Sequence, residues 1–445
     1  MGNYLVDILL EHKAGKPVGI YSVCSANQFV LEAAMLQAKR ENTALLIEST
    51  SNQVDQFGGY SGMKPKQFVE YVQEISERIK FPFEMIVLGG DHLGPNVWQD
   101  RPSKEAMKLA TDQIRSYVQA GFIKIHLDAS MRCLDDPGEP GMPLSPALIA
   151  ERTALLCKTA EEFAGENELP PLYVIGTEVP VPGGAHHDID EITPTSISDL
   201  QETIDLTRKA FFKYDLQEAW ERVIAVVVQP GVEFSDAMIH DYHREKAADL
   251  KNFIEKYELL VYEAHSTDYQ KRDLLKQMVE DHFAILKVGP ALTFAFREVI
   301  FALAFIEKHL LPVNRTRSDS NILEIIEAVM RGNPKYWKRY YPGNEARQSF
   351  SRKFSLSDRI RYYWSEPKVV SAMEILIQNL TEMEIPLTLI SQYLPEQYHA
   401  LRNGEIDYSI SDLIYHKILA VLTDYTFATK LKEVNIFKQL SEEFH

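Results

Sequence analysis

The stretch MIVLGGDHLGPN, residues 85–96, shows the pattern that decides the fold of this chain. A short apolar run leads into two glycines, and an acid and a histidine follow at once. Seven more apolar runs occur in the first three hundred residues, and most of them end in a similar way, in glycine or a charged residue. Short apolar runs bounded by such signals are typical of buried strands. The eight runs are residues 18–23, 44–47, 85–88, 122–127, 172–175, 223–228, 259–262 and 283–288.

Helical patterns separate these predicted strands. The segment 65–79 opens on a proline, which suits a first helical turn, and Ser145 with Pro146 offers an N-cap followed by an N1 proline. Strands that alternate with helices predict a parallel sheet with right-handed crossovers. Eight strands favour a (β/α)₈ barrel, and the absence of a GxGxxG fingerprint speaks against an open nucleotide-binding sheet. The predicted helices here are 28–40, 65–79, 104–120, 145–164, 197–214, 234–255 and 268–281.

Composition excludes several classes of protein. The chain has 445 residues and a formal net charge of −17, so it lacks the basic surface that binding to nucleic acid or an anionic membrane requires. Its three cysteines form no CxxC motif, which favours free thiols in a reducing compartment. No run approaches the ~18 apolar residues of a membrane span, and the first residues lack an apolar signal core. We expect a soluble cytoplasmic protein whose oligomeric state the sequence leaves open.

The pattern changes after residue 292, where helices dominate. We predict a barrel over residues 1–300 and a helical extension over 301–445 that packs on it. Aromatic residues are dense at 336–341 and 362–364, and their simplest role is to pack the extension against the barrel. The alternative is that Arg359, Arg361 or Lys353 reaches the barrel mouth and clamps a phosphate. The helices predicted in the extension are 294–311, 321–330, 358–364, 369–380, 385–402 and 409–422.

Polar residues follow most of the predicted strands, and a barrel brings the carboxyl ends of its strands around one mouth. Asp91, Asp128 and Glu178 are therefore the predicted catalytic acids or bases. His92, Glu178 and His265 are the predicted ligands of a divalent metal, since imidazole and carboxylate are suitable donors and three ligands leave open positions for substrate. This ligand set suits Zn, Mn, Ni or Co about equally.

Simpler roles stay open for several of these groups. The acid and histidine at 91–92 could cap a loop, and Glu263 and His265 could satisfy each other, since they lie two residues apart on one side of a strand. Lys124 and His126 alternate with apolar residues and could be interior polar groups of the barrel. Ser266, Thr267 and Asp268 could be a plain helix N-cap.

Further polar residues at the predicted mouth are candidates for substrate binding. Hydroxyl and amide side chains suit sugar hydroxyls, although each such loop is a weak signal alone. The segment 287–289 leads from the eighth strand into a helix, whose N-terminus can favour a phosphate. The predicted substrate-binding residues are Ser22, Glu48, Gln53, Gln229, Glu263, Lys287 and Gly289.

Several long motifs, taken in order, carry a resemblance to a known family. They are GDHLGPN, KIHLDAS, GTEVPVPGG, VVVQPGVEF, YEAHSTDYQ, LKVGPALTFAFRE and SLSDRIRYYW. The chain resembles the GatZ/KbaZ family, the so-called non-catalytic subunit of class II D-tagatose-1,6-bisphosphate aldolase, from about residue 5 to the last helix. The resemblance implies a TIM barrel related to the class II aldolases. Some relatives are labelled tagatose-6-phosphate kinase, and others are ketose 4-epimerases that act on tagatose and fructose, or their 6-phosphates, with a divalent metal.

The resemblance also implies roles for individual residues. Asp91 falls where a class II aldolase has its proton-moving acid, His92 and His265 on metal-ligand positions, and Glu178 on the acidic position after the fifth strand. Residues 287–289 fall at the aldolase phosphate site, but the usual Asn-Ala-Thr is replaced there. No GxxxxGK[ST] motif supports the kinase label.

Three functions remain from this sequence. We expect a metal-dependent ketose 4-epimerase, because a stabilising subunit would have no need for so full a set of ligand-type residues. The alternative is a non-catalytic stabilising subunit with a class II aldolase catalytic subunit as partner. The third is a sugar-phosphate sensor that binds without turnover.

Overall fold

Eight parallel strands form a closed barrel, which confirms the predicted fold class. The computed structural model describes residues 4–139, 142–165, 169–177, 192–313 and 317–434. Around the barrel the strands run in chain order, and the last pairs with the first through Ile20 and Ile285. The barrel strands are β1 (Ile20–Cys24), β2 (Leu45–Thr50), β3 (Ile86–Leu93), β4 (Lys124–Leu127), β5 (Leu172–Ile175), β6 (Val223–Val227), β9 (Val261–Ala264) and β10 (Ile285–Val288).

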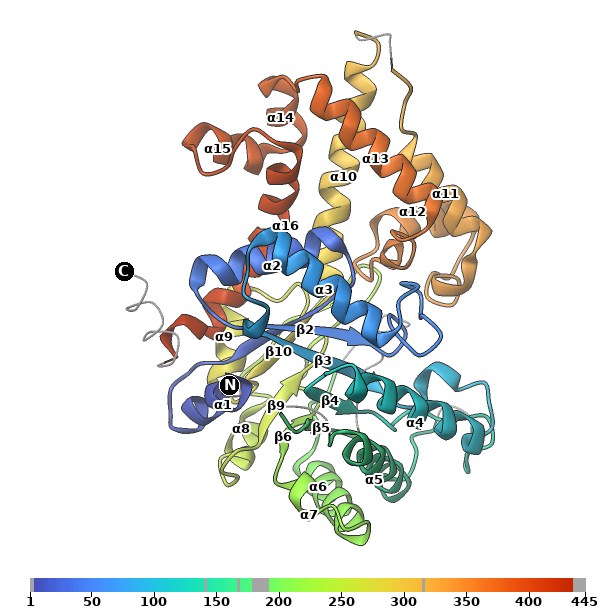
Figure 1. Cartoon of the computed structure of the whole chain (residues 1–445), viewed down its shortest axis with the longest axis vertical. Helices are drawn as coiled ribbons and strands as arrows, with labels where there is room; N and C mark the ends of the chain where they lie inside the picture. Colours follow the sequence, from blue (N-terminus) through green and yellow to red (C-terminus); the bar gives the residue numbers. More distant parts are fainter. Residues whose placement is uncertain (1–3, 140–141, 166–168, 178–191, 314–316, 435–445) are drawn as a thin grey trace.

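Helices surround the barrel and bury the outer faces of its strands (Figure 1). The helix predicted over 65–79 has those bounds, and the Ser145 hydroxyl accepts a hydrogen bond from the Leu148 N–H as the predicted N-cap. The helices that follow the strands are α2 (Gln28–Glu41), α3 (Pro65–Ile79), α4 (Ser103–Gln119), α5 (Pro146–Phe163), α6 (Ile197–Lys213), α7 (Gln217–Trp220), α8 (Ala248–Ile254), α9 (Arg272–Glu280) and α10 (Pro290–Leu310).

A further helix, α1 (Tyr4–Lys13), lies at the amino-terminal end of the strands. The Lys13 ammonium donates hydrogen bonds to the carbonyls of Ile254 and Leu260, just before β9. Buried His12 contacts the Val18 carbonyl through Nδ1 at 2.7 Å and His282 Nδ1 through Nε2 at 2.8 Å. This helix therefore closes the end of the barrel opposite to the predicted mouth.

The helix predicted over 358–364 is wrong, because only a single 3₁₀ turn, Arg359–Tyr362, forms there. Two further predicted helices are wrong in the same physical way, because a local turn overrides the apolar spacing. In place of the helix predicted over 234–255, the chain forms a small hairpin of β7 (Glu233–Phe234) and β8 (Ile239–His240). The shorter helix α8 follows this hairpin. The prediction over 385–402 is split into α14 (Leu387–Tyr393) and α15 (Pro395–Asn403). Proline disfavours helical backbone in the residue before it, and here it begins a second helix at N1.

The carboxyl-terminal helices extend away from the barrel and then return to it (Figure 1). α10 runs across the predicted boundary at residues 300 and 301, and the division into two domains stays a prediction. The last long helix packs on α2, α9 and α10, and the Gly19 N–H donates to the Thr429 carbonyl at 2.9 Å. No described helix is long and apolar enough to cross a membrane. The helices after α10, besides α14 and α15, are α11 (Ile322–Gly332), α12 (Glu345–Phe354), α13 (Pro367–Glu382) and α16 (Ile410–Thr429).

Candidate metal centre and substrate cavity

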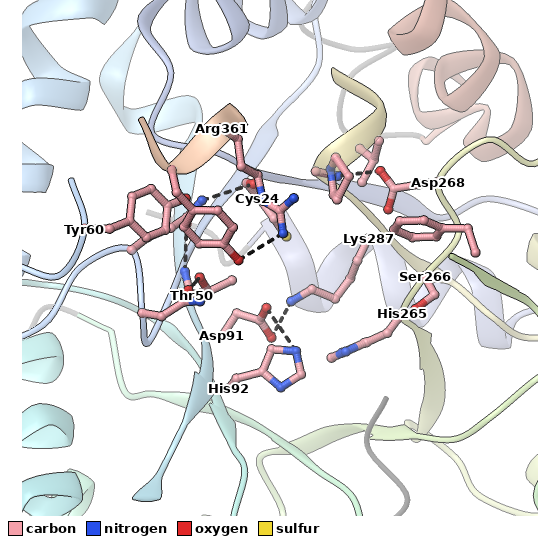
Figure 2. Close-up of a pocket in the computed structure, with 17 residues that line it drawn as sticks. Cys24, Thr50, Tyr60, Asp91, His92, His265, Ser266, Asp268, Lys287 and Arg361 are labelled. Atoms are coloured by element: carbon pink, nitrogen blue, oxygen red, sulfur yellow. Dashed lines mark hydrogen bonds and ion pairs between the residues drawn. The ribbon is translucent and has the colours of Figure 1, made fainter. Parts of the chain in front are cut away.

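A cavity with about 570 Å³ of empty space lies at the carboxyl ends of the barrel strands (Figure 2). One side carries Asp91, His92 and His265, and Lys287 lies beside them. The other side carries Arg361 from a single 3₁₀ turn, Arg359–Tyr362, in the helical extension. The cavity thus places a group of acids and imidazoles opposite a guanidinium that comes from more than seventy positions later in the chain than Lys287.

The glycines of the GGDHL stretch continue the third barrel strand and do not end it. β3 continues through Gly89 and Gly90 to Leu93, so the chain does not leave the strand at residue 88. A Cβ on Gly89 would lie 2.7 Å from the Glu48 Cγ, and one on Gly90 would lie 2.6 Å from the Leu93 Cδ1. Gly89 is therefore needed for close packing inside the barrel, and Gly90 for close packing against Tyr117 of α4. The backbone departs from regular strand geometry only at His92, whose φ is 51°.

Asp91 is a buried carboxylate with cationic neighbours. Its Oδ1 lies 2.9 Å from the His126 Nδ1 and 2.5 Å from the Lys287 ammonium. Burial alone would raise the pKa of Asp91, but the charges of His92 and Lys287 outweigh burial and hold this pKa well below its usual range. Asp91 is therefore ionised and can act as a ligand or accept a proton.

Three histidine rings converge beside Asp91. The ring centroids of His92 and His265 are 4.8 Å apart, those of His92 and His126 are 5.1 Å apart, and those of His126 and His265 are 5.2 Å apart. His92 Nδ1 lies 2.8 Å from the Asp128 Oδ2, so the carboxylate favours the tautomer that leaves Nε2 unprotonated. Burial acts to lower the pKa of His92, but the charges of Asp91 and Asp128 outweigh it and raise this pKa.

One of these three rings, His265, is neutral. Its Nε2 lies 3.0 Å from the Glu263 Oε1, and burial lowers the pKa of His265 to about 3. Glu263 and His265 do contact each other, as the simpler alternative had it, yet the His265 ring also lines the cavity. A neutral imidazole has a lone pair available for a metal or a proton.

Below the rings, two buried lysines neutralise the buried acids. Lys124 forms ion pairs with Glu48 and, at 2.5 Å, with Glu263. Lys287 forms ion pairs with Glu48 and Asp91, and its ammonium is 3.7 Å from the Glu263 Oε1. Burial acts to lower the pKa of each lysine, but the surrounding carboxylates raise both values. The network therefore keeps its charges at neutral pH.

Four of these residues offer ligand atoms that all lie within 4.8 Å of one another: Asp91, His126, Glu263 and His265. His126 supports a metal, because its buried Nε2 has no hydrogen-bond partner among the described residues while its Nδ1 contacts the Asp91 carboxylate. Such a carboxylate–histidine pair is the usual arrangement behind a metal-binding imidazole. The donor set of two imidazoles and two carboxylates fits a divalent transition metal.

This group overlaps only in part with the ligands predicted from sequence. His265 belongs to both, and His92 lies next to the group with its Nδ1 directed to Asp128. Glu178, predicted both as ligand and as base, lies outside the described residues. Asp128 is fully buried behind His92 and does not line the cavity, and its Oδ2 lies 2.8 Å from the His92 Nδ1.

Three of the seven predicted substrate-binding residues line the cavity, and the other four do not. Gln53, Lys287 and Gly289 line the cavity, and Glu48 and Glu263 are buried in the ion-pair network beneath it. Ser22 is buried below the cavity lining, where its hydroxyl lies 3.6 Å from the Cys24 Sγ. Gln229 instead accepts hydrogen bonds from the N–H groups of Gly231 and Val232 and so stabilises its own turn.

Sequence reasoning assigned no site role to Asp268. Its Oδ1 accepts hydrogen bonds from the N–H groups of Gly289 at 3.0 Å and Ala291 at 2.8 Å, so it caps α10 and not the helix that follows it. Burial raises the pKa of Asp268 to about 6. Nothing in the local sequence indicates a cap that reaches across to the next strand.

Comparisons with known proteins agree with this architecture. The chain is 45% identical to a probable tagatose 6 phosphate kinase from Sinorhizobium meliloti 1021, with a TM-score of 0.82 over 92% of this chain and all of that chain. Other similar structures are a fructose-bisphosphate aldolase from Campylobacter jejuni (12% identity, TM-score 0.42, 84% of this chain and 90% of that one) and a fructuronate–tagaturonate epimerase from Cohnella laeviribosi (9% identity, TM-score 0.47, 93% and 81%). Residues 5–430 match one family along nearly the whole chain, and the protein therefore belongs to the GatZ/KbaZ-like D-tagatose-1,6-bisphosphate aldolase subunits.

Proposed function

We propose that this protein is a metal-dependent ketose 4-epimerase that interconverts D-tagatose and D-fructose, or their 6-phosphates. The observation that carries the proposal is the buried group Asp91, His126, Glu263 and His265, which lies at the mouth of the barrel beside an open cavity. A subunit with only a stabilising role has no need for such a group at that place.

The metal would be held by His126, Glu263 and His265 of this group, with His92 as a further candidate and Glu178 as the acid predicted after the fifth strand. A divalent ion bound there would polarise the ketose carbonyl or a neighbouring oxygen as a Lewis acid. The chain itself prepares the site: Asp91 directs the His126 ring, and Asp128 directs the His92 ring.

Proton movement is the second requirement of an epimerisation at C4. Asp91 is ionised and lines the cavity, so it is the proposed base, and His92 beside it can hold a proton because its pKa is raised. Inversion would follow either by cleaving and remaking the C3–C4 bond or by moving hydrogen. A general acid or base positioned at the reacting atoms accelerates a reaction about 10²–10⁴-fold.

Four substrates and a chelator test the proposal. Purified, metal-loaded protein is incubated with D-fructose, D-tagatose and the 6-phosphate of each, and the ketoses are then separated and quantified. We expect interconversion of at least one pair, its loss on chelation, and its return on adding metal. His265→Ala should abolish it, whereas exposed His243→Ala should not. If none of the four sugars is converted, the proposal is wrong.

The rival function is a stabilising subunit, and the description of the family as aldolase subunits favours it. A class II aldolase catalytic subunit would then be the partner. If the protein converts none of the four sugars but binds such a subunit and raises its unfolding temperature, the rival is correct.

A further inference from the structure

The N-terminus of α10 follows the last barrel strand, which is where a TIM barrel often binds phosphate through free N–H groups. In this chain those groups already have partners. Asp268 accepts from Gly289 and Ala291, residue 290 is proline, and the N–H groups of Leu292 and Thr293 donate to the Gly289 carbonyl at 3.1 and 3.3 Å. The carboxylate of Asp268 would also repel a phosphate. This helix end is therefore closed to an anion.

Lys287, the lysine that lines the cavity, also has its charge already paired with carboxylates. Lys287 is surrounded by Glu48, Asp91 and Glu263, so its charge is already neutralised by carboxylates. Burying one cation among three acids leaves no excess positive charge to attract a phosphate.

Arg361 differs from Lys287 in its electrostatic surroundings. It lines the cavity, and in the part of the chain that the structure describes it forms no ion pair with a carboxylate, although the charges of Asp268 and Asp358 lie near enough to interact with it. Its Nη1 donates to the carbonyls of Ser357 and, at 3.1 Å, Asp358, and its Nη2 donates to the Tyr362 hydroxyl at 3.0 Å. These three bonds hold the guanidinium plane and leave two of its five N–H donors without a partner among the described residues.

A second cavity adjoins the first at this arginine. It has about 740 Å³ of empty space and shares Cys24, Gln53, Tyr60 and Arg361 with the first. Arg361 therefore has open space on two sides, and the Tyr60 ring packs edge-on against the Tyr362 ring at 4.6 Å. A fixed guanidinium with spare donors, open space and adjacent phenol groups suits a phosphate monoester, which accepts paired hydrogen bonds.

We propose that Arg361, supplied by the helical extension, binds the phosphate of a ketose 6-phosphate whose reacting carbons lie at the Asp91 and His265 side of the cavity. Figure 2 shows Arg361 across the cavity from His92 and His265, as this orientation requires. The inference rests on the proposed function and narrows its substrate to the phosphorylated sugars. The extension would then be part of the substrate site, in addition to packing on the barrel.

Calorimetry with D-tagatose and D-tagatose 6-phosphate tests this assignment on the full-length protein. We expect the phosphate ester to bind more tightly by about tenfold or more, the effect of a charge-assisted hydrogen-bond pair. Arg361→Gln should reduce the ratio of the two dissociation constants to about one, and Arg361→Lys should give an intermediate ratio because it keeps the charge but loses the planar fork.

Arg359→Gln is the matched control. Arg359 lies two positions away and is buried against Tyr340, with its guanidinium 3.3 Å from the ring centroid, but it does not line either cavity. Its replacement should leave the preference for the phosphate ester in place. If Arg361→Gln does not fold, competition decides: inorganic phosphate should weaken binding of the phosphate ester in the unmodified protein and not that of D-tagatose.

The outcomes separate this inference from the proposed function. Absence of a preference, whether both sugars bind equally or neither binds, overturns the inference, and so does a preference that survives Arg361→Gln. Epimerisation of free sugars without a phosphate preference would keep the function and overturn the phosphate site. A phosphate preference lost in Arg361→Gln, without turnover, would keep the site and overturn the function.

Discussion

The Nδ1 atom of His126 lies 2.9 Å from the Asp91 Oδ1, although the two residues come from neighbouring strands and both are buried. This contact orients the imidazole and leaves its Nε2 unpartnered among the described residues. His126→Ala should therefore reduce bound Mn²⁺ or Zn²⁺ by at least about tenfold, since removal of even an outer partner of a ligand has effects of about 10–100-fold. Metal analysis after dialysis measures the loss. Exposed His243→Ala should retain the metal, and equal metal content in the two variants would contradict the assignment.

We expect Asp128 to act through His92, which it contacts. Asp128→Asn replaces an acceptor with an amide and weakens control of the His92 tautomer, because the carboxylate lies 2.8 Å from Nδ1. We expect kcat to fall about 10–100-fold with a smaller change in KM. Steady-state kinetics on the sugar that is turned over measures both. A change confined to KM would instead place Asp128 in contact with substrate.

Much of the barrel could be predicted from the sequence because each strand is buried and short. The run at 172–175 has the observed bounds of β5, and the eight strands occur where apolar runs end in polar residues. The exact extent of some strands depends on tertiary packing and could not be predicted. Gly89 and Gly90 continue a strand because side chains of neighbouring elements fill the space of their missing Cβ atoms, and no local pattern shows this.

The candidate site was predictable only as a set of strand ends. Asp91, His92 and His265 do line one cavity. Which atom faces which neighbour depends on the register of adjacent strands, so the inward-facing His126 and Glu263 could not be told from interior packing groups. The sequence offered Arg359, Arg361 and Lys353 as basic residues that could reach the mouth, and only the path of the extension shows that Arg361 is the one that lines the cavity.

Lys124 provides a test of the buried charge network. Lys124→Met removes a cation that lies between Glu48 and Glu263, and each of these carboxylates then remains buried with less compensation. We expect the free energy of unfolding to fall by about 3–5 kcal/mol. Denaturant unfolding measures the loss. Adding Glu48→Gln to Lys124→Met should recover part of it, and an additive further loss would show that the two residues do not interact.

His12 should make stability depend on pH. Burial lowers the pKa of His12 from 6.5 to about 4, so the unfolded chain binds a proton that the folded chain does not between these values. Stability therefore falls as pH decreases from about 6.5 to about 4, and at 1.36 kcal/mol per pKa unit the loss approaches about 3 kcal/mol. Urea unfolding at several pH values measures the slope.

His12→Gln should flatten that slope, while exposed His243→Gln should leave it unchanged. Equal slopes in the two variants would assign the pH dependence to other groups.

The hydrogen bond between the Gly19 N–H and the Thr429 carbonyl joins the residue before the first strand to the end of α16. During synthesis, the barrel cannot reach its final packing at β1 until α16 has left the ribosome. A nascent chain stopped before α16 would expose the apolar faces of α2 and α10, and chaperones or proteases that recognise such faces would act at that stage.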